Sequence, residues 1–446
     1  MPLMKYARKI GIPFATAGLL APVARASDLI PVPDFTEYQV PLSMPPAPDH
    51  PLWEWLNVSL LLAALIAASY IALVSRSRRN MFLLTIGSLI WFGFLYQGCI
   101  CPIGSIQNVV LAVFDSSYAI PLTVVLVFLL PLVFTLFFGR VFCAAVCPLG
   151  AIQEIVAVRT TRVPSWLDHA LGLFPYIYLG LAVIYAATGT AFVICRYDPF
   201  VPMFRLSGDV NMLIFGGALL VMGVFIGRPY CRYLCPYGAV LAVLSKVSKW
   251  HARIPPDECI HCRLCEDSCP YGAIERPSVP PARETRPAAR RRLAVMLTLA
   301  PLLVIGAAGL GWLMTVPLAR LDHNVRLAER IHAEDTGQVE GMTDASEAFR
   351  NTGQPKEELL AMVADIRSRV RLFAVLLGAW TGLVVAVKLI SLSVYRRRDE
   401  YQPDRSRCVS CGRCYWYCPS EQVRLGLIED ISELVDLETE EAKAAS

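Results

Sequence analysis

This chain has little charge and few histidines. Charged residues make up 17% of its 446 residues and hydrophobic residues 55%, a balance far from that of an average soluble domain. None of its six histidines pairs with another across the long apolar stretches, and the chain has no C-x2-C-H sequence, so we expect no haem. A phosphate-binding glycine loop and the spacing of a catalytic triad are also missing. The composition therefore predicts a membrane protein.

Seven apolar stretches are long enough to cross a bilayer core, which needs about 20 residues per helix. They lie near residues 57–75, 81–98, 119–138, 172–190, 211–227, 293–315 and 371–394. Residues 1–26 begin with basic residues, continue with a short apolar run and close with Ala-Arg-Ala, which is the pattern of a secretory signal peptide. An uncleaved anchor is the alternative for this segment. The expected fold class is an α-helical membrane protein with about seven transmembrane helices.

Basic residues beside the apolar stretches predict their orientation in an inner membrane. They are Arg76, Arg78, Arg79, Arg140, Arg159, Arg162, Arg290 to Arg292 and Arg396 to Arg398. Such residues concentrate at cytoplasmic ends, so the mature amino terminus with residues 27–56 and a polar helical hairpin at 316–370 should be extracytoplasmic. We assign the net charge of +4 to this orientation signal and expect no nucleic-acid partner. An acidic tail occupies 429–446.

Eight cysteines stand in two copies of one phrase. The copies are Cys259-Ile-His-Cys262-Arg-Leu-Cys265-Glu-Asp-Ser-Cys269-Pro270 and Cys408-Val-Ser-Cys411-Gly-Arg-Cys414-Tyr-Trp-Tyr-Cys418-Pro419. Both have the C-x2-C-x2-C-x3-C-P spacing of bacterial ferredoxins, in which the fourth cysteine ligates the other cluster of a pair. The spacing predicts two [4Fe-4S] clusters, one bound by Cys259, Cys262, Cys265 and Cys418 and one by Cys408, Cys411, Cys414 and Cys269. Structural zinc is the weaker alternative, since zinc does not need this spacing.

The two phrases lie in segments 251–285 and 400–428, on either side of the transmembrane helices expected at 293–315 and 371–394. Together they should form a bacterial-type 2[4Fe-4S] ferredoxin-like module assembled from two separate segments. The orientation places this module in the cytoplasm, where thiols stay reduced.

A second cysteine repeat lies in the membrane core of five helices expected at 57–250. Its copies are Gly139-Arg-Val-Phe-Cys143-Ala-Ala-Val-Cys147-Pro and Gly227-Arg-Pro-Tyr-Cys231-Arg-Tyr-Leu-Cys235-Pro. Each follows a span that should end at the cytoplasmic face, and each puts its two thiols on one face if the segment is helical. Four thiols from two related halves could bind an additional iron–sulfur or metal centre. The alternative is a structural turn, because Pro and Gly stop helices.

Three further cysteines should lie at the external face. Cys99 and Cys101 belong to a third C-P sequence after the second span, and Cys195 follows the fourth span. Thiols at both faces would place redox or metal sites on either side of about 30 Å of hydrocarbon. A disulfide with one buried thiol explains the external set equally well.

With these motifs, residues 57 to 425 resemble the NosR and NapH type of polyferredoxin membrane proteins. The resemblance rests on the spans, on the eight ferredoxin cysteines, and on Cys143, Cys147, Cys231 and Cys235. NosR-type proteins support nitrous-oxide reductase and NapH oxidises quinol for a periplasmic nitrate reductase. NosR-type proteins also carry an extracytoplasmic flavin domain before the spans, where this chain has only about 30 residues. The resemblance therefore implies FMN on a separate partner chain, and it leaves the terminal reductase open.

We expect the chain to transfer electrons by iron–sulfur clusters between a cytoplasmic or quinone-pool donor and an extracytoplasmic flavin or reductase partner. It would then be a subunit of an oxidoreductase system, and not a stand-alone enzyme. One alternative is a maturation factor that reduces or delivers copper or iron with the C-x3-C thiols, since soft thiolates select copper(I). Another is a redox sensor with labile clusters. Ligand spacing does not encode the direction of electron flow.

Overall fold

The computed structural model describes residues 51–98, 102–116, 118–187, 192–254, 259–278, 285–320, 322–339, 341–394 and 398–429. All of them belong to one structural unit, Pro51–Ser446. The expected signal peptide, most of the segment 27–56, Cys99, Cys101 and nearly all of the acidic tail lie outside the described residues.

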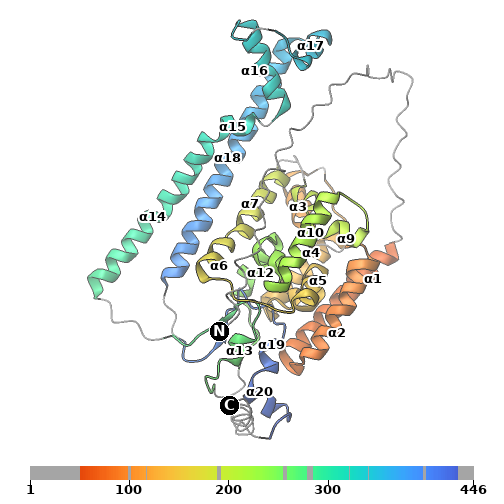
Figure 1. Ribbon diagram of the computed structural model, residues 1–446, viewed down its shortest axis with the longest axis vertical. Coiled ribbons are helices and arrows are strands. Elements are labelled where there is room, and N and C mark those ends of the chain that lie inside the picture. The colour runs from red at the N-terminus through yellow and green to blue at the C-terminus, as the bar shows by residue number, and fades with distance from the viewer. Residues whose placement is uncertain are drawn as a thin grey trace, which may run out of the picture. The chain divides into compact units, whose positions relative to one another are not determined.

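The described residues are mostly helical (Figure 1). The first group of helices is α1 (Pro51–Tyr70), η1 (Ile71–Ser75), α2 (Arg78–Ser88), η2 (Leu89–Leu95), α3 (Pro102–Phe114), α4 (Leu122–Phe138), η3 (Phe142–Val146), α5 (Pro148–Val156), α6 (Ser165–Leu171), α7 (Phe174–Ala187), α8 (Val193–Arg196), α9 (Val201–Arg205), α10 (Val210–Phe225), α11 (Pro229–Tyr233) and α12 (Pro236–Ser245). The remaining elements are α13 (Leu264–Asp267), β1 (Ile274–Glu275), α14 (Arg286–Leu313), α15 (Thr315–Ala319), α16 (His323–Asp335), α17 (Asp344–Asn351), α18 (Lys356–Ser393), β2 (Gln402–Pro403), α19 (Arg413–Trp416) and α20 (Pro419–Arg424).

The described residues of each of the seven apolar stretches lie mostly on helix. In the part of the chain that the structure describes, four helices are long and apolar enough to cross a membrane, namely Leu52–Ser75, Ser165–Ala187, Arg286–Leu313 and Lys356–Ser393. These four indicate a multi-pass membrane protein. The apolar helices α4 and α10 are shorter, at 17 and 16 residues, so a count of seven spans stays a prediction.

Helices α14 and α18 run side by side (Figure 1). Their backbones approach closely because small residues recur every four positions on the facing sides. A Cβ added to Gly382 would lie 2.6 Å from the carbonyl oxygen of Leu303, and one added to Gly378 would collide with that of Ala307. Such small-residue spacing is typical of helix pairs in membranes. No residue of α14 is buried, which suits a helix that packs on one side against α18 and faces lipid on the others.

The helix pair is joined to the rest of the unit at α7. Trp380 of α18 donates a hydrogen bond from Nε1 to the carbonyl oxygen of Tyr176, at 2.7 Å. The rings of Tyr185 and Phe373 stack with 5.5 Å between their centroids. At the far end of the pair, Val325 and Ile331 of α16 pack against Leu359 and Val363 of α18.

A buried apolar core fills the remaining helices. Leu65, Ile103, Val146, Phe200 and Leu241 are all at most 1% exposed and belong to it. Three C-P sequences border this core, and each proline begins a helix, α3, α5 or α12. Proline suits the first helical position, where its missing N–H has no partner to lose.

The two ferredoxin phrases meet through a short antiparallel strand pair. Ile274 of β1 pairs with Pro403 of β2, and Glu275 pairs with Gln402. Arg398 adds an ion pair to Glu275 at 2.5 Å. The split phrases thus lie together in one module, although α14 to α18 separate them in the chain.

Candidate metal centres

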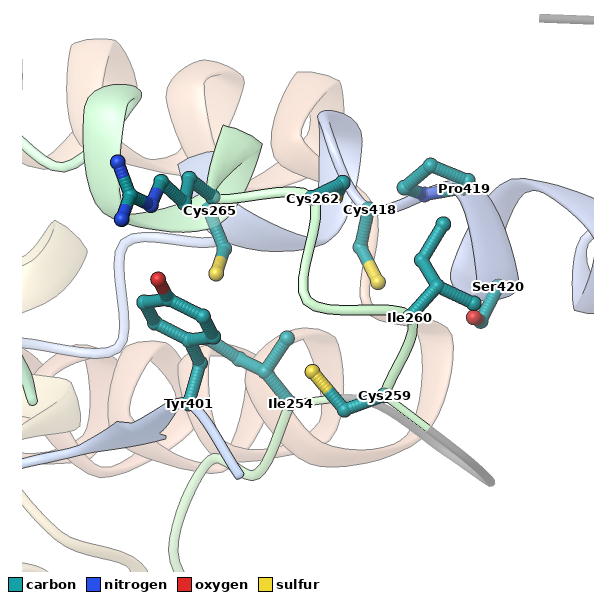
Figure 2. Close-up of a pocket in the computed structure, with 10 residues that line it drawn as sticks. Ile254, Cys259, Ile260, Cys262, Cys265, Tyr401, Cys418, Pro419 and Ser420 are labelled. Carbon is teal, nitrogen blue, oxygen red and sulfur yellow. The ribbon is translucent and has the colours of Figure 1, made fainter. Parts of the chain in front are cut away.

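Four cysteines of the two phrases line one pocket, and we call them thiol group 1. They are Cys259, Cys262, Cys265 and Cys418. Figure 2 shows the Sγ atoms of Cys259, Cys265 and Cys418 facing one another beside Tyr401. The pocket holds about 320 Å³ of empty space, part of it open to solvent. Cys262 is exposed, so this group lies at the surface of the module.

The other four ferredoxin cysteines line a second pocket, and we call them thiol group 2. They are Cys269, Cys408, Cys411 and Cys414. This pocket holds about 360 Å³. Backbone N–H groups donate to its sulfurs, from Ala273 to Cys269 and from Ser410 to Cys408, both at 3.4 Å. Each group takes three thiols from one phrase and the fourth from the other, which is the partition expected from the spacing.

The backbone of the two phrases has the same unusual conformation. The residues that flank the second cysteine of each phrase have positive φ angles: 57° at His261 and 67° at Arg263, and 57° at Ser410 and 78° at Gly412. Such angles are costly for residues other than glycine. Their occurrence at matching positions indicates that both phrases wrap around a group of the same kind.

The thiols of each group surround a space and do not converge on a point. Among the described residues, no three His, Cys, Asp or Glu side chains have the spacing to bind a single metal ion. In a [4Fe-4S] cluster each thiolate binds a different corner of the cubane, so its ligands must stand apart. Four cysteines around each pocket supply the ligand set that one [4Fe-4S] cubane requires.

The C-x3-C-P cysteines form a third collection, the core quartet, consisting of Cys143, Cys147, Cys231 and Cys235. Cys235 lies close enough to the other three thiols to interact with their charges. The two thiols of a pair do not share one continuous helix, because Cys147 and Cys235 have extended backbone and immediately precede α5 and α12. Side-chain and backbone donors face the sulfurs: Gln153 lies 3.4 Å from the Sγ of Cys231, and the N–H of Gly238 lies 3.2 Å from that of Cys235.

Each copy of the C-x3-C repeat contributes an arginine that contacts the C-P turn of the other copy. Arg228, from the second copy of the repeat, lies on the C-P turn of the first copy, where a Cβ added to Gly150 would be 3.1 Å from its Nη1. Arg140, from the first copy, lies on the turn of the second, where a Cβ added to Gly238 would be 3.3 Å from its Nη2. The glycine of each C-P-x-G sequence thus leaves room for the arginine of the other half. This reciprocity gives the quartet an approximate twofold arrangement and positive charge beside its thiols.

The buried carboxylate of Glu154 has four polar side-chain partners. Its Oε1 lies 2.6 Å from Arg78 Nη2 and 3.0 Å from Arg413 Nη2, and its Oε2 lies 3.1 Å from Arg228 Nε and accepts the hydroxyl of Tyr271. Burial alone would raise the pKa of Glu154, but the three guanidiniums and Tyr271 outweigh it and hold the pKa at about 2. The carboxylate is therefore ionised at neutral pH.

Contacts through Glu154 attach the ferredoxin module to the core. Tyr271 directly follows the first phrase and Arg413 lies in the second, whereas Arg228 immediately precedes α11 of the core. Asp168 of α6 forms a second attachment, with ion pairs to Arg407 at 2.8 Å and to Arg232 at 2.6 Å.

Cys195 has surroundings that parallel those of Cys231. A Cβ added to Gly104 of the third C-P sequence would lie 3.0 Å from the Sγ of Cys195. Gln107 accepts the N–H of Ile194 at 2.8 Å, as Gln153 accepts the N–H of Tyr230, the residue before Cys231, at 3.0 Å. The described part of this segment thus repeats one contact of the core quartet, in which a glutamine side chain accepts the backbone N–H of the residue before a cysteine.

The sequence reasoning singled out the thiols but not Glu154, Gln107 or Gln153, and it read Arg140 only as an orientation mark. A signal was present, since Gly-Arg recurs four residues before the first cysteine of each copy. Glu154 is likewise a lone acidic residue near the end of an apolar helix, and such ionisable residues usually have a partner or a function.

Two protein families match parts of the chain. Residues 120–173 and 209–255 match Fer4_5, a 4Fe-4S binding domain. Residues 252–275 and 401–423 match Fer4, also a 4Fe-4S binding domain. The first match contains the whole core quartet, and the second contains the eight cysteines of thiol groups 1 and 2.

Several curated proteins are similar to parts of the chain. NirI of Paracoccus denitrificans is 35% identical over 127 residues, which is 27% of this chain and 18% of NirI. YccM of Escherichia coli, whose name assigns it provisionally to electron transport, is 33% identical over 118 residues, or 24% of this chain and 33% of YccM. The regulatory protein NosR of Pseudomonas aeruginosa is 36% identical over 80 residues, covering 17% of this chain and 11% of NosR.

The chain thus spans a third or less of these three relatives. No solved structure matches it. The family matches and the relatives confirm the resemblance inferred from the motifs. The chain is a 4Fe-4S binding polyferredoxin with distant homology to NirI, YccM and NosR.

Proposed function

We propose that this chain transfers electrons across a membrane by iron–sulfur clusters. Thiol groups 1 and 2 each bind one [4Fe-4S] cluster, and the core quartet binds a third iron–sulfur centre. The observation that carries the proposal is the position of the three thiol collections. Two phrases far apart in the chain share their thiols between two pockets, and the resulting module is attached directly to the quartet.

Clusters of this kind accept and donate single electrons at potentials set by hydrogen bonds, charge and exposure. The residues of this chain supply those influences. Arg140 and Arg228 place positive charge beside the quartet, and backbone N–H groups donate to Cys235, Cys269 and Cys408. Burial of Cys147 and Cys235, both 7% exposed, keeps water from the quartet.

We further propose that the ferredoxin module faces the cytoplasm and that α15 to α17 lie on the opposite side. Helix α14 has 28 residues and is about 42 Å long, more than the roughly 30 Å of a bilayer core. Arg290 to Arg292 lie in the first two turns of α14, at the end that follows the first ferredoxin phrase in the chain, in agreement with the positive-inside rule. The donor would be a cytoplasmic carrier or the quinone pool, and the acceptor an extracytoplasmic flavin or reductase partner on a separate chain.

A further redox or metal site at Cys195, with Cys99 and Cys101 as its sequence neighbours, belongs to the same proposal. Support comes from the matched positions of Gly104 and Gln107 and of Gly150 and Gln153.

Metal analysis of the purified, anaerobically handled protein tests the proposal. We expect about 12 iron atoms per chain, four for each of three clusters, and about 8 in both Cys143→Ser and Cys262→Ser. EPR spectroscopy should show that the two variants lose different signals. About 8 iron atoms in the parent and in Cys143→Ser would leave the quartet without iron, and an iron-free parent would refute the proposal. Stoichiometric copper lost in Cys143→Ser would instead favour the maturation factor.

Transport of electrons is tested in vesicles that contain the protein. A reductant enclosed with the module should reduce an acceptor on the other side when a suitable flavin partner is present. Vesicles with Cys231→Ser should not do so. Absence of transfer in the parent, with its clusters intact, would contradict a role in electron transport.

A further inference from the structure

Four side chains contact the Glu154 carboxylate, and three of them lie within three residues of a cysteine in the sequence. Arg78 is the fourth. Arg228 stands three residues before Cys231 of the quartet, Tyr271 stands two after Cys269, and Arg413 lies between Cys411 and Cys414. Arg78 is linked to the same region, since its Nη1 donates to the carbonyl oxygen of Cys411 at 3.0 Å. All the thiols concerned belong to thiol group 2 or to the core quartet.

Packing brings the same two collections together. Cys143 of the quartet contacts an apolar cluster that contains Val409, Cys411 and Tyr271. A Cβ added to Gly227, which immediately precedes Arg228, would lie 2.7 Å from the carbonyl oxygen of Pro270. The backbones of the second C-x3-C segment and the first phrase are therefore in direct contact next to Cys269.

The Asp168 attachment also lies beside thiol group 2. Arg407, which pairs with Asp168, immediately precedes Cys408. Arg140 Nη1 donates to the carbonyl oxygen of Ser406 at 2.9 Å. Thiol group 1 has a different environment, with an exposed Cys262 and with Ile260 46% exposed at its pocket.

We propose that Glu154 is the positioning residue that holds thiol group 2 against the core quartet, which makes group 2 the neighbour of the membrane core and leaves group 1 facing solvent. The inference rests on the proposed function, in which both collections bind iron. Glu154 touches no thiol itself. It acts by neutralising Arg228 of the core and Arg413 of the module on one buried carboxylate, and a group that is almost fully buried has little water to replace these contacts.

The test compares Glu154→Gln with Glu266→Gln. Glu266 is a matched control because it follows Cys265 of thiol group 1 and also pairs with two arginines, Arg162 and Arg276. In Glu154→Gln we expect the iron content of the two ferredoxin groups to persist. Amide hydrogen exchange should rise at least tenfold in residues 271–275 and 408–413, and the magnetic interaction between the group 2 and quartet centres should weaken in EPR spectra. Glu266→Gln should change neither.

Unchanged hydrogen exchange and unchanged magnetic interaction in Glu154→Gln would overturn the inference, as would equal effects in both variants. If Glu154→Gln does not fold, Tyr271→Phe removes only one hydrogen bond and should give a smaller rise in exchange in the same two segments; no rise there would overturn the inference too. Failure of the proposed function is distinguishable. About 8 iron atoms in the parent would show that the quartet binds no iron, and this would contradict the proposed function. The hydrogen-exchange experiment would still test whether Glu154 attaches thiol group 2 to the core.

Discussion

Arg228 is completely buried, and its guanidinium donates hydrogen bonds to three different residues. Its guanidinium pairs with Glu154 and donates to the carbonyl oxygens of Cys143 and Ala144. We predict that Arg228→Met lowers the free energy of unfolding by about 3–5 kcal/mol, the usual cost of removing one partner of a buried charge pair. A thermal unfolding midpoint in detergent below that of the parent would report this loss of stability. Arg367→Met removes a half-exposed arginine that pairs with Glu329 and should leave the midpoint unchanged. An unfolding midpoint for Arg228→Met equal to the parent's would contradict this reading.

The contact that Glu154 makes between the ferredoxin module and the core stabilises the protein only where Glu154 is ionised, so its contribution depends on pH. Its pKa is lowered from an ordinary value of 4.5 to about 2, so its stabilising effect is present above pH 4.5 and is lost as the pH falls toward 2. The stability difference between the parent and Glu154→Gln should therefore be constant from about pH 8 to about pH 5 and shrink only below about pH 4.5. Denaturant unfolding at several pH values measures that difference. A decrease that begins between pH 7 and 6 would show that the carboxylate has a much higher pKa.

Among single residues, the cysteines could be predicted from the sequence, but Glu154 and its partners could not. The cysteines were predictable because cluster ligation imposes a fixed spacing along the chain, and the structure brings the expected sets of four to two pockets. Their assignment as ligands stays a prediction. Glu154 and its partners were missed because their contacts join residues up to 259 positions apart, and such pairing leaves no periodic trace in one sequence.

At the scale of elements, α14 and α18 depend on glycine for their close approach. Replacing Gly378 with leucine should separate the two helices, since its Cβ would collide with the carbonyl oxygen of Ala307. Spin labels at the exposed positions Leu302 and Leu383 should show a longer and broader distance distribution in Gly378→Leu. The matched control is Gly306→Leu on α14, where an added Cβ meets nothing within 4 Å. Equal distributions in the two variants would argue against small-residue packing.

The helices of this chain were predictable where apolar runs are long. The described residues of the seven stretches are mostly helical, because a run of about 20 apolar residues has few alternatives in a membrane. The short helices α3, α5 and α12 were not expected. They have 13, 9 and 10 residues, too few to cross a bilayer, and their starts are fixed by the proline after each cysteine, which the sequence reasoning took as a possible stop signal.

For the molecule as a whole, the helix pair predicts where its two ends lie. An epitope tag inserted after Gly337, in the exposed turn between α16 and α17, should bind antibody on spheroplasts with an intact inner membrane. A tag after Gly426, which follows α20 and is also exposed, should bind only after permeabilisation. The two insertion points serve as controls for each other. Antibody binding to both tags, or to neither, in intact spheroplasts would contradict the proposed orientation.

The exchange of fourth cysteines between the two phrases also has a consequence for biogenesis. Thiol group 1 is incomplete until Cys418 has been made, and thiol group 2 is incomplete until Cys408, Cys411 and Cys414 can join Cys269. The ribosome must produce the entire α14–α18 hairpin before either of these steps. The hairpin must then enter the bilayer and fold back before the second phrase can reach β1. If both groups bind clusters as proposed, iron loading of the module comes late in the synthesis of the chain. A product truncated before Cys408 would then leave three thiols of thiol group 1 and Cys269 of thiol group 2 without their partner cysteines.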